Sequence, residues 1–193
     1  MCLLMPSLIV MASVVYRHLP SRRFSMSSAF LKNETADAPV VIPARAPLPP
    51  GAINYVTPRG LAMLRQELAD METQRGAIQH EPDEHERSRQ LTLINGRVGA
   101  LHHRIASASV VDPATQSRAE IRFGATAVLQ PKTGPDRQLT IVGVDEADAA
   151  HGRIAFTAPV ARAMQGKRIG DTVLMRTIKG EATYTVVAID YVD

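Results

Sequence analysis

The spacing of apolar residues between positions 57 and 106 constrains the fold of this chain more than any other feature. Apolar side chains recur at alternating intervals of three and four residues in two runs, which is the heptad spacing of paired helices. The first run contains Leu61, Leu64, Leu68, Met71 and Ile78, with Arg75 in the remaining slot, and the second contains Leu91, Ile94, Val98, Leu101 and Ile105. Thr57-Pro58 is typical of a helix start, and Pro82 separates the two runs. Because each helix can bury its stripe only against the other, we expect an antiparallel helical hairpin, a coiled coil, over residues 55–109.

The spacing of apolar residues changes after the hairpin, from the period of a helix to that of a strand. Residues 113–193 contain β-branched runs that alternate apolar and polar side chains between short turns, as strands do. These runs lie at 123–130, 137–144, 152–156, 171–177 and 181–190. Between the third and the fourth, the segment APVARAMQGK predicts a short helix that begins at Pro159 and ends at Gly166. The predicted fold class is therefore α+β, with the helical hairpin followed by a small antiparallel β domain that carries one helix.

The N-terminal part of the chain resembles a tail and a linker more than a packed domain. Residues 1–25 are apolar and then basic, which is the reverse of a secretory signal. They are interpreted as a translation start placed too far upstream of Met26, as a targeting segment or as a genuine tail. Residues 34–51 hold five prolines after position 38, a composition that excludes helix and favours an extended tether or a docking strand. Residues 1–54 are therefore expected to form a disordered tail and a Pro-rich linker.

The composition excludes several classes of protein. The single cysteine, Cys2, cannot form an internal disulfide framework or a Cys-rich zinc site, and it fits a reducing compartment. No run reaches the roughly 18–20 unbroken apolar residues that a membrane-spanning helix needs. With 45% hydrophobic and 21% charged residues, the chain has the composition of a soluble globular protein. We therefore expect a cytoplasmic protein that has no membrane partner.

Several stretches of the sequence, taken in order, resemble one known family. They are YVTPRGLAMLRQEL, FGATAVL, IVGVDEAD, TAPVARAMQGKRIGDTV and KGEATYTVVAIDYV, and the match covers about residues 55–192. The chain is similar to the Gre family of bacterial transcription elongation factors (GreA/GreB). The resemblance implies a hairpin that enters the secondary channel of RNA polymerase and an FK506-binding-protein-like (FKBP-like) domain that docks at the channel rim. It further implies a monomeric, non-enzymatic regulator without a cofactor of its own, which meets nucleic acid non-specifically within the elongation complex.

The stretch HEPDEHER places four carboxylates at the expected tip of the hairpin. They are Glu81, Asp83, Glu84 and Glu86. In family members, acidic tip residues help to hold a second Mg²⁺ at the catalytic centre of the polymerase, which then cleaves backtracked RNA, and oxygen ligands suit this ion. This tip lacks the Asp-x-x-Glu-Asn pattern of the family, and each arm of the hairpin is shorter by about one heptad, or roughly 10 Å.

Three interpretations of the acidic tip remain. The carboxylates form a solvated turn that favours the N-terminus of the second helix, or they form a channel-facing tip that acts on the polymerase Mg²⁺ only by repulsion or competition. The third, stimulated cleavage, needs a reach that the shorter hairpin lacks. A self-contained metal site is not favoured, because His80 and His85 are five positions apart across Pro82, off the spacing of one helix face.

Two further groups of residues are candidates for contact with a partner. Positions 87–109 contain no acidic residue, so the arginines there form either a solvated face or a contact with RNA phosphates or an acidic channel wall. These arginines are Arg87, Arg89, Arg97 and Arg104. The resemblance also implies a polymerase-docking motif in the β domain, matched in part by Thr157, Ala158, Pro159 and Arg162. Asp145 and Glu146 follow a predicted strand and are interpreted as turn acids or partner contacts.

The favoured function is an elongation regulator that binds RNA polymerase but lacks the tip motif for transcript cleavage. The alternative is a short-hairpin antagonist, or a member of the kind described as a nucleoside diphosphate kinase regulator, which shares the same docking domain. A prolyl isomerase is disfavoured, because its apolar pocket needs aromatic side chains and the predicted β domain contains few.

Overall fold

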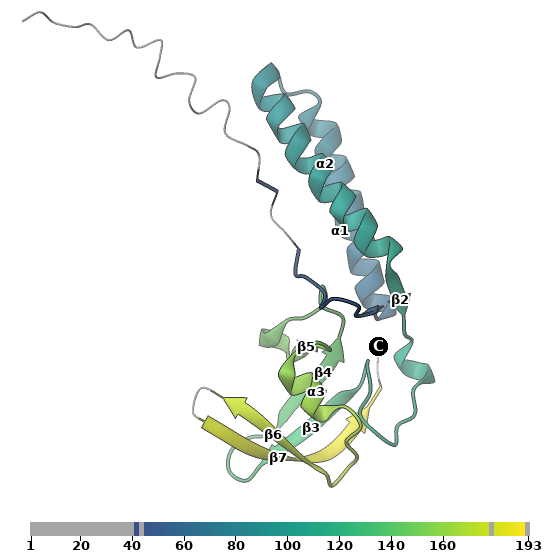
Figure 1. Cartoon of the computed structure of the whole chain (residues 1–193), viewed down its shortest axis with the longest axis vertical. Helices are drawn as coiled ribbons and strands as arrows, with labels where there is room; N and C mark the ends of the chain where they lie inside the picture. Colours follow the sequence, from purple (N-terminus) through teal and green to yellow (C-terminus); the bar gives the residue numbers. More distant parts are fainter. Residues whose placement is uncertain (1–40, 43–44, 178–179, 192–193) are drawn as a thin grey trace, which may run out of the picture. The chain divides into compact units, whose positions relative to one another are not determined.

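Figure 1 shows the computed structural model of this chain, which describes residues 41–42, 45–177 and 180–191. The expectations for residues 1–40, namely an upstream start, a targeting segment or a tail, lie outside the described residues. The described residues all belong to one compact unit, which holds both the helices and the sheet. Within the described part of the chain, no helix is long and apolar enough to cross a lipid bilayer. The elements confirm the α+β class that the sequence predicts.

Helix α1 (Pro58–Ile78) and helix α2 (Glu84–Ala106) form the hairpin and lie side by side (Figure 1). The side chain of Thr57 caps α1 by accepting a hydrogen bond from a free amide of the first turn at 2.8 Å. Asp83 caps α2 in the same way at 3.1 Å. The two apolar stripes meet near the start of α1 and the end of α2, a region that we call the base of the hairpin. The side chains packed there are Val56, Leu61, Leu64, Leu68, Met71, Leu101, Ile105 and Ala108.

Two short strands at the base, β1 (Asn54–Val56) and β2 (Ala108–Val110), pair in parallel. The pair is not predicted from the sequence, because three residues are too few to show a period of two. It ties the chain that enters α1 to the chain that leaves α2. The amide nitrogen of the Asn54 side chain also donates to the carbonyl of Arg104 at 2.9 Å and to Ser107 Oγ at 3.1 Å, which fixes the end of α2.

Five strands form the larger sheet, in the order β5-β4-β3-β7-β6. They are β3 (Thr126–Pro131), β4 (Arg137–Val142), β5 (Arg153–Ala155), β6 (Thr172–Thr177) and β7 (Gly180–Asp190), and each overlaps a predicted run. The expectation of an antiparallel sheet is wrong at one edge, because β4 and β5 pair in parallel. The chain between them passes through the 3-10 helix η2 (Ala149–His151) and turns at Gly152. This turn requires glycine, because φ is 70° and a Cβ would lie 2.5 Å from the carbonyl oxygen of Gln138.

The core of the sheet domain is formed by apolar side chains of the sheet and of helix α3 (Pro159–Met164). The 3-10 helix η1 (Pro113–Thr115) leads from the hairpin into this domain. The fully buried members of the core include Ala127, Leu129, Ile141, Ala161, Met164 and Val186. Three aromatic rings, those of Tyr55, Phe123 and Phe156, contact one another at centroid separations of 5.7 to 5.9 Å. Because Tyr55 belongs to β1, these rings join the base of the hairpin to the sheet domain.

Candidate functional site

The four carboxylates of the tip lie in the turn between α1 and α2 and in the first turn of α2. The hydrogen bond from the Glu86 amide to Asp83 lowers the pKa of Asp83. Glu81 accepts a bond from the Asp83 amide at 3.3 Å, and Glu86 accepts one from Gln90 at 2.7 Å. Glu84 is exposed in the first turn of α2. Glu81 and Asp83 therefore help to build the turn, Glu86 bonds within α2, and the side chain of Glu84 is exposed to solvent.

The described residues do not gather a metal site at the tip. No three or more His, Cys, Asp and Glu side chains of this part of the chain are arranged to hold an ion. The His80 ring nitrogen Nδ1 lies 3.0 Å from the carbonyl oxygen of Gly76, so it is engaged with the last turn of α1. Mg²⁺ often takes only one or two carboxylates from a protein. Single tip carboxylates such as Glu84 can therefore meet a metal ion that another protein holds.

Three of the arginines predicted to contact RNA or a channel wall lie on or near the surface of α2. Arg87 donates to the Glu81 carbonyl at 2.8 Å and closes the tip turn. The side chain of Arg89 is 68% exposed and lies 3.9 Å from Glu86. Arg97 is half-buried farther along the helix. These side chains can attract phosphate or carboxylate groups by charge, without reading any sequence.

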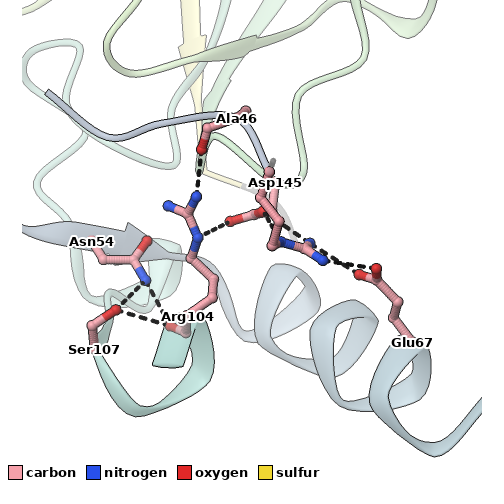
Figure 2. A network of polar contacts seen from close by, with 7 residues as sticks. Ala46, Asn54, Glu67, Arg104, Ser107 and Asp145 are labelled. Carbon is pink, nitrogen blue, oxygen red and sulfur yellow. Dashed lines mark hydrogen bonds and ion pairs between the residues drawn. The ribbon is translucent and has the colours of Figure 1, made fainter. Parts of the chain in front are cut away.

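The fourth arginine, Arg104, belongs to a buried network at the base of the hairpin, which Figure 2 shows. Its side chain is 10% exposed, and its Nε lies 3.3 Å from Oδ2 of Asp145. Its Nη2 donates to the carbonyl of Ala46. Burial and pairing withdraw this charge from the surface, so Arg104 is not available to a partner in the way that the exposed Arg89 is.

The carboxylate of Asp145 also binds a second arginine, Arg45, which precedes β1. Nη1 and Nη2 of Arg45 donate to the two carboxylate oxygens of Glu67 at 2.8 and 3.0 Å. Nε and Nη2 donate to Oδ1 of Asp145 at 3.2 and 3.0 Å. The hydrogen bond to Glu67 raises the pKa of Arg45. A bidentate pair between a guanidinium and a carboxylate is stronger than a single hydrogen bond. Asp145, in the turn after β4, thus connects the linker and α2 to the sheet domain, and Arg45 links this site to Glu67 of α1.

Glu146 makes a second attachment between α1 and the turn after β4. Thr57 Oγ1 donates to its Oε2 at 2.5 Å, and Arg59 Nη1 donates to its Oε1 at 3.1 Å. A Cβ at Gly60 would lie 2.8 Å from the same carboxylate. Asp145 and Glu146 therefore bind groups within the protein and act as internal anchors. Of the two interpretations that the sequence allows, turn acids or partner contacts, the first fits these contacts. Their partners lie up to 100 positions away, so no local pattern could have identified them.

The predicted docking residues surround the start of α3. Ala158 is the N-cap and makes no side-chain capping bond, Pro159 opens the helix, and Arg162 is exposed. Thr157 is half-buried in the preceding turn. A groove of about 620 Å³ extends from Pro159 to the edge strand β6. Its lining residues are Pro159, Val160, Leu174, Met175, Arg176 and Glu181. An exposed apolar groove with charged residues at its rim suits a protein partner.

The fold is that of a two-part protein, in which a helical hairpin is joined to a mixed sheet domain. The sequence profile described as "Transcription elongation factor, GreA/GreB, C-term" matches residues 116–191. Transcription elongation factor GreA of Methylobacterium nodulans is 35% identical over 151 residues, with 70% of this chain and 96% of that protein covered. GreA of Alkalilimnicola ehrlichii is 30% identical over 152 residues, with the same coverage of 70% and 96%. The chain therefore belongs to the GreA/GreB family of transcription elongation factors.

Two solved structures show a weaker likeness. Transcription elongation factor GreA/GreB from Nitrosomonas europaea is 19% identical, with a TM-score of 0.37 and coverage of 71% of this chain and 98% of that one. GreA factor homolog 1 (Gfh1) of Thermus thermophilus is 21% identical, with a TM-score of 0.35 and coverage of 72% and 99%. The family assignment rests on the sequence relatives and not on these structures.

Proposed function

We propose that this chain binds RNA polymerase and regulates transcript elongation as a monomeric, non-enzymatic factor of the cytoplasm. Family membership supports the partner, because the relatives are named as transcription elongation factors. In this proposal the hairpin enters the secondary channel, and a sheet domain of FKBP-like fold docks at the channel rim through the groove beside α3. Arg87, Arg89 and Arg97 then supply non-specific positive charge toward RNA or the channel wall.

The tip supports regulation without stimulated transcript cleavage. The helices contain 21 and 23 residues, which correspond to about 32 to 35 Å. Metal coordination tolerates errors of only a few tenths of an ångström, so a hairpin one heptad short in each arm does not reach the same ion if the sheet domain docks alike. Asp83 is also engaged as the cap of α2. Glu84 remains the carboxylate best placed to act on a polymerase-bound Mg²⁺ from a distance.

The direct test adds the purified protein to backtracked elongation complexes and follows the RNA 3′ end. We expect the protein to be retained on immobilised polymerase while the RNA shortens only at its intrinsic rate. A cleavage-competent GreA from a relative serves as the positive control. Rapid shortening by this chain contradicts the reach argument, and failure to bind polymerase contradicts the proposed partner.

The docking groove can be tested separately from the tip. Leu174 is 56% exposed in the groove, and Leu174→Asp places a charge where the proposed partner buries apolar surface. We expect about tenfold weaker binding to polymerase, or about 1.4 kcal/mol. Val187→Asp, on β7 and 37% exposed, is the matched control because Val187 does not line the groove. Equal binding by the two variants argues that the sheet domain docks through another surface.

The second candidate is an antagonist, of the short-hairpin kind or of the kind described as a nucleoside diphosphate kinase regulator. The short arms and the exposed Glu84 favour it, because a hairpin in the channel excludes a longer one without replacing its tip. Competition against a cleavage-competent GreA separates the two: loss of cleavage as this chain is added indicates an antagonist. Prolyl isomerisation is not supported, because Phe123, Tyr184 and Tyr191 are buried in the core of the sheet domain.

A further inference from the structure

Part of the expected linker lies against the base of the hairpin. We call residues 45–52 the strap. Its first residue, Arg45, is held between Glu67 of α1 and Asp145 of the turn after β4. The carbonyl of the next residue, Ala46, accepts a hydrogen bond from Arg104 of α2, as Figure 2 shows. The strap therefore contacts both helices of the hairpin and the sheet domain.

Ile42 contacts α2 at a point nearer the tip than the contacts of the strap. Ile42 lies on Gly96, where a Cβ would be 2.1 Å from Ile42 Cδ1. At Gly99, three residues further along α2, no atom lies within 4 Å of the point where a Cβ would be, so the contact does not extend to that residue. Prolines at positions 47, 49 and 50 favour an extended backbone, which suits a segment that spans a surface without folding on it.

The strap is attached mainly by charge. A pocket of about 440 Å³ lies between it and α2, so the two surfaces are not closely packed. The residues that line this pocket are Ile42, Arg45, Leu48, Ala100, His103, Arg104 and Ser107. Ile42 is 41% exposed even though it touches Gly96. An attachment with little apolar burial and two ion pairs, both made by Arg45, is weakened by salt and by removal of that one charge.

Detachment of the strap leaves the buried charges of the base paired. Asp145 keeps Arg104 at 3.3 Å, and the side chain of Glu67 is already 39% exposed, so water can solvate it. The contacts of Glu146 with Thr57 do not involve the strap and persist. Because detachment leaves no buried charge without a partner, the strap can detach and rebind while the rest of the base stays folded.

We propose that residues 45–52 are a releasable strap with a closed and an open state. In the closed state Ile42 covers α2 at Gly96, the strap covers it at Arg104, and Arg45 bridges the hairpin to the turn after β4. In the open state both positions on α2 are accessible. The strap thereby controls how much of the hairpin's surface another molecule can contact. This equilibrium is a property of the free protein and does not depend on polymerase binding.

Double electron–electron resonance on the full chain measures the two states. Spin labels are placed by Val41→Cys, where the side chain is 80% exposed, and by Ser88→Cys on the exposed side of α2, with Cys2→Ser. We expect a narrow, short distance for the closed parent. Arg45→Ala should raise the open fraction about tenfold, since it removes hydrogen bonds to two carboxylates. About 1 M NaCl, with a Debye length of roughly 3 Å, should shift the parent in the same direction.

Matched variants separate release of the strap from general destabilisation. Arg65→Ala removes an exposed arginine of α1 and should retain the parent's distance. Gly96→Ala should displace Ile42 and raise the open fraction, whereas Gly99→Ala should not. If Arg45→Ala fails to fold by circular dichroism, Glu67→Gln tests the same bond. The proposal is overturned if Arg45→Ala (or Glu67→Gln in its place) and Gly96→Ala give the same distributions as their controls, or if the parent is already broadly distributed at low salt.

Discussion

The base and the tip of the hairpin contain the same residue types in different surroundings. At the base, the side chains of Asp145 and Glu146 are 9% and 4% exposed, and both bind groups from distant parts of the chain. At the tip, the side chain of Glu86 is 44% exposed, and the acids bond only to neighbours in the turn and in α2. Charge pairs strengthen as water is excluded. Burial therefore makes the carboxylates of the base internal anchors, whereas the negative charge of the tip stays accessible from solvent.

The largest difference between the base and the tip is expected in the free energy of unfolding when the side chain of Glu146 is removed. In Glu146→Ala, Thr57 and Arg59 lose their common partner, so we expect the free energy of unfolding to fall by about 2 to 3 kcal/mol. Glu84→Ala removes an exposed tip carboxylate and should change it by about 0.5 kcal/mol or less. Urea titrations followed by circular dichroism measure both values. Equal losses would show that burial does not distinguish the two ends.

Two glycines of α1 provide a comparison of intermediate size. Gly60, at the base, faces the carboxylate of Glu146, so the Cβ of Gly60→Ala forces a shift of this buried carboxylate. We expect the free energy of unfolding to fall by about 1 to 2 kcal/mol. Gly76, near the tip, has no atom within 4 Å of the point where a Cβ would lie, and Gly76→Ala should raise stability by up to about 1 kcal/mol through helix propensity. Thermal unfolding of the two variants gives the signs directly, and stabilisation by Gly60→Ala contradicts the close packing of the base.

Local signals in the sequence predicted the helices and strands. They could not predict contacts between residues that are far apart in the chain. Thr57-Pro58, Pro159 and the heptad spacing are patterns within a few residues, and the helices begin where these patterns indicate. The parallel pairing of β5 depends on the turn at Gly152, whose close approach to β4 has no local signature. The break between the two helices lies around Pro82, the local signal that separates the two apolar runs.

Arg104 shows why the candidate contact surface could be predicted only in part. It occurs in the same acid-free stretch as Arg87 and Arg89, and composition alone assigns all of them to one charged face. Its partner Asp145 lies in the turn after β4, in another part of the fold. The position of a charge on a helix is a local property, whereas its burial depends on what the rest of the chain brings to that face.

The smallest effect is expected at the tip, from the titration of Asp83. The hydrogen bond from the Glu86 amide lowers the pKa of Asp83 below its usual value of 3.8, which is the value expected in the unfolded chain. A lowered pKa in the folded state contributes stability above pH 3.8 that is lost as the pH falls through the folded value. We therefore expect the helix signal of α2 to fray below about pH 4, without loss of the sheet domain. Asp83→Asn keeps a capping side chain but cannot titrate, so its circular dichroism between about pH 5 and pH 2 should depend less on pH than that of the parent. Identical pH profiles for the two proteins would assign the fraying to the other acids of the first turn, and the cap would then act through its hydrogen bond and not through its charge.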